Sequence, residues 1–288
     1  MELRRLKRKA RHWFDRTVSV DLRGETDDVL EGFRIAKYRK FILDVPLENW
    51  RTKVPIGSVC TADTIDPLIN TLWLHDEGKC DRYVGSPLQS YFESFQPQSM
   101  AEGVGLVDRS TCSAAWKTRP YQAVLPWRSI NVLKKEPTSQ QRRNRALQDI
   151  LSRSGLESVG ELSGKIYWGP VSQAFGEACF LRLTSLFRSI RMKGYRFPPP
   201  DQPFRVEILI RDGKGVIEPT SGKHRIVTIA ANRLSSVPVY LGGKNSTFVR
   251  REQASDWPLV KAGFYTVDEA QAVFDRVFDG VPVWTPPR

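Results

Sequence analysis

The sequence is poor in the residues that build metal sites and disulfide frameworks. It holds four cysteines and three histidines among 288 residues, and no Cys-x-x-Cys pair occurs. Long stretches of chain separate the cysteines, which are Cys60, Cys80, Cys112 and Cys179. A structural zinc site needs clustered thiolate and imidazole ligands. We therefore expect no such site, and we expect reduced thiols.

Long apolar runs are also lacking. No stretch approaches the roughly 20 apolar residues that a membrane-spanning helix needs. The first five residues lead into further charge rather than into the apolar segment of a secretion signal. These absences predict a cytoplasmic protein without a transmembrane segment. The hydrophobic share of 40% and the aromatic share of 10% are ordinary for a globular chain, and they exclude a wholly disordered one.

Acidic residues are outnumbered by basic ones. The chain has 44 lysines and arginines against 32 aspartates and glutamates, which gives a formal net charge of +12. Such an excess attracts anions, and these include nucleic acid, nucleotide phosphates and acidic membrane surfaces. The charge alone does not choose among these partners.

Two basic segments are candidates for contacts with nucleic acid. In residues 1–16, apolar residues recur among basic ones at spacings of three and four, which is typical of a basic amphipathic helix. Such a helix suits a nucleic-acid backbone or an acidic membrane surface, and the alternative is a frayed terminus. The second segment, 134–145, runs into a helical pattern. We place a domain boundary here, between an accessory α+β region of unknown role at 17–135 and a domain at 136–288.

The clearest local patterns lie in the C-terminal half. Apolar residues at helical spacing predict a helix that Gly194 ends. An alternating run at 204–210, the turn residues Asp212 and Gly213, and a return run at 216–218 predict a β-hairpin. The elements predicted next are a small-residue helix at 226–232 and a strand at 236–241. The fold class expected from these patterns is α+β.

The turn between this hairpin and the small-residue helix is a candidate anion site. Its residues bring hydroxyls, a glycine that permits tight backbone geometry, and cationic or hydrogen-bonding groups: Thr220, Ser221, Gly222, Lys223, His224 and Arg225. Unpaired N–H groups at a helix start favour an anion, and adjacent cations strengthen that preference. The turn therefore suits a phosphate cradle. The alternative is a capped helix start with solvated cations.

The same residues carry a resemblance to a known superfamily. Residues 221–225, the alanine-containing helix after them and residues 237–239 resemble the Gly-x-His-Arg core of the ParB/sulfiredoxin-like superfamily. Upstream, residues 189–195 are similar to the Ser-Ile-x-x-x-Gly helix end of that superfamily. The resemblance covers about residues 165–245. It implies a small mixed-sheet domain of the ParB/sulfiredoxin-like type in the C-terminal half, with an irregular α+β region before it.

The resemblance also implies a ligand. Members of the superfamily include CTP-binding partition proteins, ATP-dependent sulfiredoxins and small-molecule kinases that act on serine. In that picture, Gly222, Lys223, His224 and Arg225 hold the phosphates of ATP or CTP, and Ser221 lies at the lip. Lys223 stands where sulfiredoxins have a nucleophilic cysteine and where partition proteins commonly have an acidic residue. No helix-turn-helix unit is apparent after the motif, so sequence-specific DNA partitioning lacks its reading element.

These departures favour a nucleotide-dependent phosphotransferase that acts on a small hydroxylated acceptor. Such catalysis rests on positioning and on charge neutralisation. Mg²⁺ takes oxygen ligands, and Glu218 is favoured over Glu207 and Asp212 because it ends the strand that enters the turn. Glu177, near the start of the preceding helix, is the candidate general base. The alternative function is a ParB-like nucleic-acid-binding protein or nuclease.

A last helix is indicated near the end of the chain. Thr266 and Glu269 have capping-box spacing, and an apolar stripe follows: Ala270, Val273, Phe274, Val277 and Phe278. We expect the aromatic segment 257–265 to dock this helix onto the domain. The alternative is a lid over the nucleotide, in which Trp257 or Tyr265 packs on the base.

Overall fold

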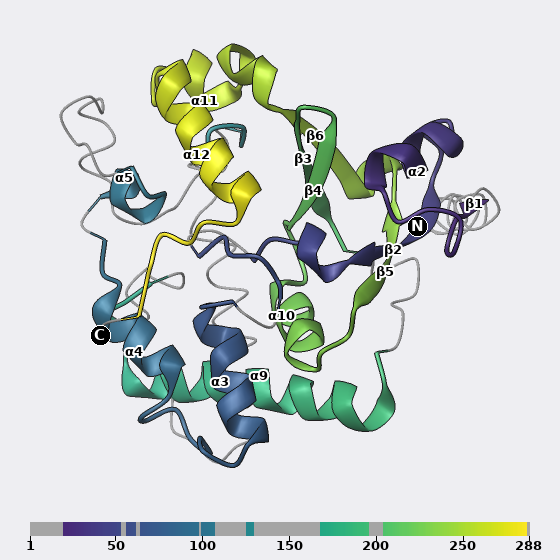
Figure 1. Ribbon diagram of the computed structural model, residues 1–288. Coiled ribbons are helices and arrows are strands. Elements are labelled where there is room, and N and C mark those ends of the chain that lie inside the picture. The colour runs from purple at the N-terminus through teal and green to yellow at the C-terminus, as the bar shows by residue number, and fades with distance from the viewer. Residues whose placement is uncertain are drawn as a thin grey trace, which may run out of the picture.

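The computed structural model describes residues 20–52, 56–61, 64–97, 99–106, 125–129, 168–195 and 204–286 (Figure 1). These residues form eight α-helices and two three-stranded sheets, so the fold is α+β as the sequence predicts. Within these ranges, no helix combines the length and the apolar character needed to cross a membrane. The basic segments 1–16 and 134–145 lie outside the described residues.

The first sheet joins two strands from the first fifty residues to one strand from the last quarter of the sequence. Its order is β1 (Val20–Asp21), β2 (Phe41–Pro46) and β5 (Ser236–Leu241). Strands β2 and β5 are antiparallel, and their register runs from Phe41 opposite Leu241 to Pro46 opposite Ser236. Alternate residues of β2 are buried, as period-2 geometry requires for a strand with one face on the core. Strands from both expected domains, 17–135 and 136–288, thus belong to one sheet.

The second sheet contains the predicted hairpin. Its order is β4 (Lys214–Pro219), β3 (Val206–Arg211) and β6 (Ser246–Arg250). Strands β3 and β4 are antiparallel, and β6 runs parallel to β3. The two turn residues have positive φ, +50° at Asp212 and +73° at Gly213, which is the conformation that a two-residue hairpin turn favours. The hairpin prediction is confirmed.

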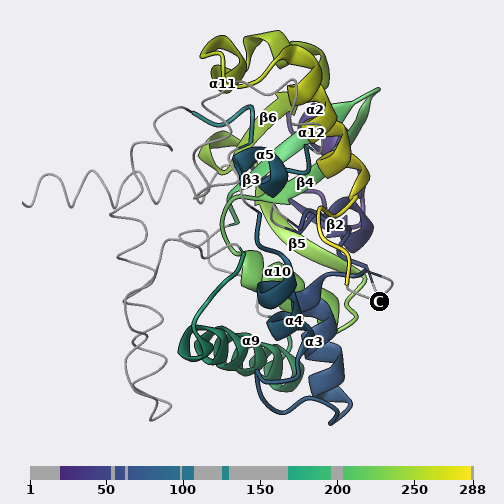
Figure 2. The ribbon, with the colours of Figure 1, turned by 90° about the vertical axis from the view of Figure 1, so that its left-hand side faces the viewer.

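Helices cover both sides of the sheets. Figure 2 shows α11 and α12 on one side, α3, α4 and α9 on the other, and α10 between the sheets and α9. The helices are α2 (Val29–Ile35), α3 (Pro67–Asp76), α4 (Pro87–Ser94), α5 (Met100–Gly103), α9 (Gln173–Lys193), α10 (Lys223–Ala231), α11 (Pro258–Lys261) and α12 (Val267–Asp279). Gly194 follows α9 with φ of +69°, so the predicted end of that helix is confirmed.

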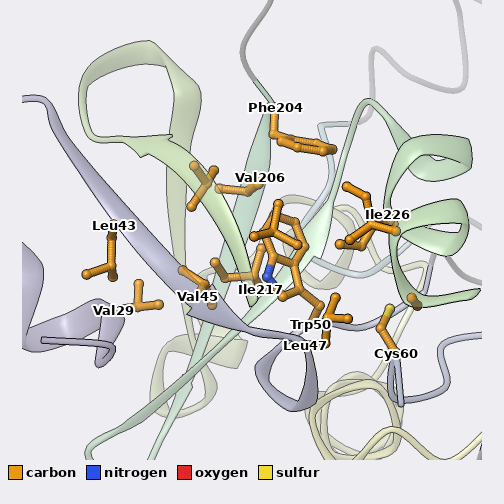
Figure 3. Close-up of a cluster of buried hydrophobic side chains, with 14 of the residues drawn as sticks. Val29, Leu43, Val45, Leu47, Trp50, Cys60, Phe204, Val206, Ile217 and Ile226 are labelled. Carbon is orange, nitrogen blue, oxygen red and sulfur yellow. The ribbon is translucent and has the colours of Figure 1, made fainter. Parts of the chain in front are cut away.

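The main core lies between the two sheets and α10. Figure 3 shows Trp50 at its centre, with Ile217 from β4 and Ile226 from α10 beside it. The Trp50 ring meets the Phe204 ring edge-on, with 5.4 Å between their centroids, and neither side chain is exposed. Phe204 lies two residues before β3, and Arg205 beside it bonds to the turn that begins α10, so the core extends up to that turn.

A second core holds α12 against the other face of the hairpin. The predicted capping box is present: Glu269 N donates to Thr266 Oγ1, and Thr266 N donates to a Glu269 carboxylate oxygen. Trp257 is buried, and its ring centroid lies 5.6 Å from that of Phe274 and 5.2 Å from that of Trp127. Segment 257–265 therefore docks α12, as expected.

Candidate functional site

The turn from β4 into α10 has the backbone that the glycine predicted. Gly222 is the N-cap residue with φ of +84°, and α10 begins at Lys223. A Cβ at position 222 would lie 2.7 Å from carbons of the Phe204 ring. Both the left-handed conformation and this close approach require glycine. Since glycine has no side chain, no side chain of the N-cap residue caps the first turn of α10.

The two hydroxyl residues tie this turn to the approach of β3. Thr220 N and Ser221 N donate to Arg205 O at 2.7 and 3.2 Å, and Thr220 Oγ1 donates to the same oxygen at 3.0 Å. Ser221 Oγ accepts from Arg205 N at 3.1 Å. The hydroxyl proton of Ser221 is not used in that bond, so this group retains a donor for a ligand.

One cationic group of the turn, that of Arg225, stacks on Phe204. The guanidinium carbon of Arg225 lies 4.5 Å from the Phe204 ring centroid, a cation–π contact. Lys223, His224 and Arg225 are each half-buried and make further contacts. Burial raises the pKa of Tyr195 to about 12, and the charge of Arg225 opposes that shift. Arg225 therefore stacks on a buried aromatic ring and is close enough to Tyr195 for its charge to act on that hydroxyl.

Helix α9 adds one more cation to this surface. Burial raises the pKa of Cys179 to about 11, while the charges of Lys223 and Arg182 oppose the rise. Both cations thus act on Cys179, and α9, which carries Arg182, packs against α10. Sequence reasoning missed Arg182, Tyr195 and Phe204 as site residues. Of these three, only Tyr195 belongs to a motif recognised in the sequence, the segment 189–195 at the end of α9.

Glu218 lies elsewhere, on the face of the hairpin that carries the second core. Its side chain is fully buried, and Arg128 Nη2 donates to its Oε2 at 3.0 Å. Glu207 is directly opposite on β3, and it receives Trp127 Nε1 at 2.7 Å and Arg128 Nη2 at 3.0 Å. The two carboxylates therefore share one arginine in the interior.

This environment does not suit the magnesium role expected of Glu218. Mg²⁺ keeps several waters and takes exposed carboxylate oxygens beside substrate phosphates, whereas the Glu218 carboxylate is enclosed and paired with Arg128. Burial, and then the charge of Glu218, raise the pKa of Glu207 to about 8. The pair thus holds a proton near neutral pH. In the part of the chain that the structure describes, no three His, Cys, Asp or Glu residues are grouped to hold a metal ion.

Glu177, the candidate base, lies near the start of α9. It is half-buried. Burial raises the pKa of Tyr83, and the charge of Glu177 adds to that rise. Gly176 lies against the Tyr83 ring, so this turn of α9 packs on the segment before α4. The interaction that the structure gives for Glu177 is thus with Tyr83, in the segment before α4.

Comparisons with protein-family models, with curated proteins and with solved structures find no match to this chain.

Proposed function

We propose that this chain binds a nucleoside triphosphate, ATP or CTP, at the start of α10. The observation that supports this most is the start of a helix whose N-cap residue is a glycine with φ of +84°, followed by three consecutive half-buried groups, Lys223, His224 and Arg225. Helix N–H groups and nearby cations together favour phosphate. Arg182 adds charge from α9, and the order of α9, the β3–β4 hairpin, α10 and β5 agrees with the resemblance to the ParB/sulfiredoxin-like superfamily.

Phosphoryl transfer to a small hydroxylated acceptor is the reaction that we propose for the bound nucleotide. Lys223, His224 and Arg225 would neutralise the phosphates, and the Ser221 hydroxyl would donate to a phosphate oxygen at the lip. The nucleotide would bring Mg²⁺ with it, and Glu218 holds no part of that ion in this proposal because its carboxylate is enclosed. Glu177 stays the candidate base for the acceptor hydroxyl.

Nucleic-acid binding is the second candidate, because the same cations suit a phosphodiester backbone. The net charge of +12 supports it. The two candidates differ in salt dependence: backbone binding weakens steeply as salt rises, since each neutralised phosphate releases counterions. A single triphosphate site in a half-buried turn depends less on salt.

Calorimetric titration of ATP, CTP and GTP, each with Mg²⁺, tests the proposal. Arg225→Ala should lower the affinity for the triphosphate about 30-fold, which corresponds to roughly 2 kcal/mol for the loss of a charged partner. Lys214→Ala is the matched control, because Lys214 is an exposed cation at the far end of the hairpin. It should leave the affinity unchanged.

Two results would overturn nucleotide binding. The first is that no triphosphate binds to protein whose folding is verified by its unfolding transition. The second is that Arg225→Ala and Lys214→Ala weaken binding equally. Titration of a DNA duplex at two salt concentrations would then decide whether the second candidate holds.

A further inference from the structure

An aromatic side chain, that of Tyr38, lies exposed on the turn between α2 and β2. Tyr38 is 68% exposed. Its ring centroid lies 6.0 Å from that of Phe33 and 6.3 Å from that of Phe248, so part of the ring rests on neighbouring rings and the remainder meets solvent. Figure 1 shows α2 and β1 together at the right of the molecule, apart from α10. This aromatic side chain therefore belongs to a different surface from the start of α10.

The backbone at Tyr38 has an unusual conformation. Lys37 and Tyr38 have φ of +50° and +59°, in the left-handed region that residues with a Cβ rarely adopt. Backbone hydrogen bonds fix this conformation. Lys37 N donates to Arg34 O at 3.2 Å, and the next N–H donates to Phe33 O at 3.0 Å. A fixed turn thus presents Tyr38 to solvent, and strained backbone of this kind is concentrated at functional sites.

Three basic residues lie around this turn. Lys37 and Arg39 flank the tyrosine in the sequence, and both are exposed. Arg250 comes from β6, and its guanidinium carbon lies 5.9 Å from the ring centroid of Phe248. Glu252 approaches Arg250 at 3.9 Å, but both side chains are well exposed, so this ion pair is weak. The surroundings of the exposed ring therefore have a net positive charge.

Two more basic residues come from the strand ends beside the same turn. A Cβ at Gly243 would lie 3.1 Å from Lys40 Cε, so the turn after β5 packs on Lys40. Lys244 is the next residue of that turn, and it is exposed. Val20 N donates to Lys40 O at 3.0 Å. The chain that carries the basic segment 1–16 is therefore tethered at this place.

We propose that this surface binds single-stranded nucleic acid, with a base stacked on the exposed ring and the phosphates along the basic side chains. The surface consists of Lys37, Tyr38, Arg39, Lys40, Lys244 and Arg250. Aromatic rings bordered by basic residues bind single strands in this way, because every base offers a π-face and every nucleotide a phosphate. A duplex keeps its base faces stacked on one another, so it should bind more weakly. The inference does not depend on the proposed nucleotide site, whose cations lie on α10.

Fluorescence anisotropy of a labelled oligothymidylate of about 15 nucleotides, titrated with the full chain, tests the stacking contact. Tyr38→Ala should lower the affinity at least about five-fold, the low end of the loss expected for one stacked base. Tyr38→Phe is the matched control, because it keeps the ring, and it should bind within about two-fold of the wild type. A duplex of the same length should bind at least about five-fold more weakly than the single strand.

The salt dependence tests the phosphate contacts. Lys244→Ala should reduce the slope of log affinity against log salt by about 0.7, the change expected for one phosphate contact on a single strand. Lys193→Ala removes an exposed cation at the end of α9 and should leave the slope unchanged. Arg225→Ala should leave the affinity for the oligothymidylate unchanged, which separates this surface from the start of α10.

The proposal fails if the wild type does not bind the oligothymidylate, if Tyr38→Ala binds it as tightly as Tyr38→Phe, or if the duplex binds as tightly as the single strand. Binding that Arg225→Ala abolishes and Tyr38→Ala leaves intact would place the nucleic acid at the α10 turn instead. Vesicles that contain phosphatidylserine provide the last comparison. If Tyr38→Ala abolishes binding to these vesicles and the oligothymidylate does not bind, the surface is one for acidic membranes and the proposal is overturned.

Discussion

Glu207 and Glu218 face each other directly across the β3–β4 hairpin, and a single guanidinium, that of Arg128, lies 3.0 Å from an oxygen of each. Two carboxylates and one cation leave an excess negative charge if both acids ionise. Burial and the charge of Glu218 raise the pKa of Glu207 to about 8. The pair therefore keeps one proton at neutral pH, which removes the excess charge. This relationship has a consequence for stability.

The free energy of unfolding should fall as pH rises from about 4.5 to about 8. Glu207 has a pKa near 4.5 in the unfolded chain and about 8 in the folded protein. Between these values the folded state binds a proton that the unfolded state has released, so raising the pH favours unfolding by at most about 1.4 kcal/mol per pH unit. Glu207→Gln should flatten this slope, because a neutral amide replaces the protonated acid.

Urea denaturation at pH 5, 6.5 and 8 measures the effect. The exposed pair of Arg23 and Asp21 gives a control, since Asp21→Asn should leave the slope in this pH range unchanged. The same slope in wild type and in Glu207→Gln would show that the buried pair does not hold the proton.

Gly222→Ala should destabilise the protein by about 3 kcal/mol. The substitution meets two penalties, one for a left-handed φ and one for overlap with the Phe204 ring. Gly78→Ala isolates the first, because Gly78 has φ of +71° and an added Cβ would meet nothing within 4 Å. That variant should lose about 1 kcal/mol. Chemical denaturation compares the two, and equal losses would mean that the Phe204 ring yields freely.

Trp257→Ala should cost stability and leave nucleotide affinity unchanged. The Trp257 ring is buried between those of Trp127 and Phe274, so its removal should lower the free energy of unfolding by about 4 kcal/mol. Met192→Ala, at a position that is 75% exposed, should change it by less than about 0.5 kcal/mol. Calorimetric titration of the folded variant provides the second measurement. Lost affinity with intact stability would support the lid alternative instead.

Local signals explain which elements could be predicted from the sequence. The end of α9 at Gly194, the Asp212-Gly213 turn and the capping box at Thr266 each depend on residues within a few positions of one another. Their geometry is set by backbone conformation and short-range hydrogen bonds, and such features are legible without knowledge of the rest of the chain.

The orientation of Glu218 could not be predicted in the same way. Alternation indicates a strand with one buried face, but β4 is buried on both faces: Ile217 belongs to the main core, and Val216 belongs to the second core. Glu218 shares the face of Val216, and only the distant Arg128 and Trp127 make that face able to hold a carboxylate. No sequence pattern near position 218 predicts these partners.

The candidate site shows the same division. The glycine and the cations of the α10 turn are consecutive in the sequence, so the motif was visible, whereas Arg182 and Phe204 come to it from other elements. The contacts of Arg276 gave no sequence signal, because an arginine within an amphipathic helix is ordinary. Its hydrogen bonds to Val104 O and Val281 O depend on how the segment after α5 and the chain after α12 pack against α12.

The pairing of β2 with β5 also bears on how the chain is made. During synthesis β2 leaves the ribosome long before β5, the strand that completes its sheet. Until then α2, which precedes β2, can already pack Phe33 against Phe41, but one edge of β2 has no partner strand. A strand with an exposed edge is prone to mispairing, so β2 is vulnerable to wrong partners until β5 has been made.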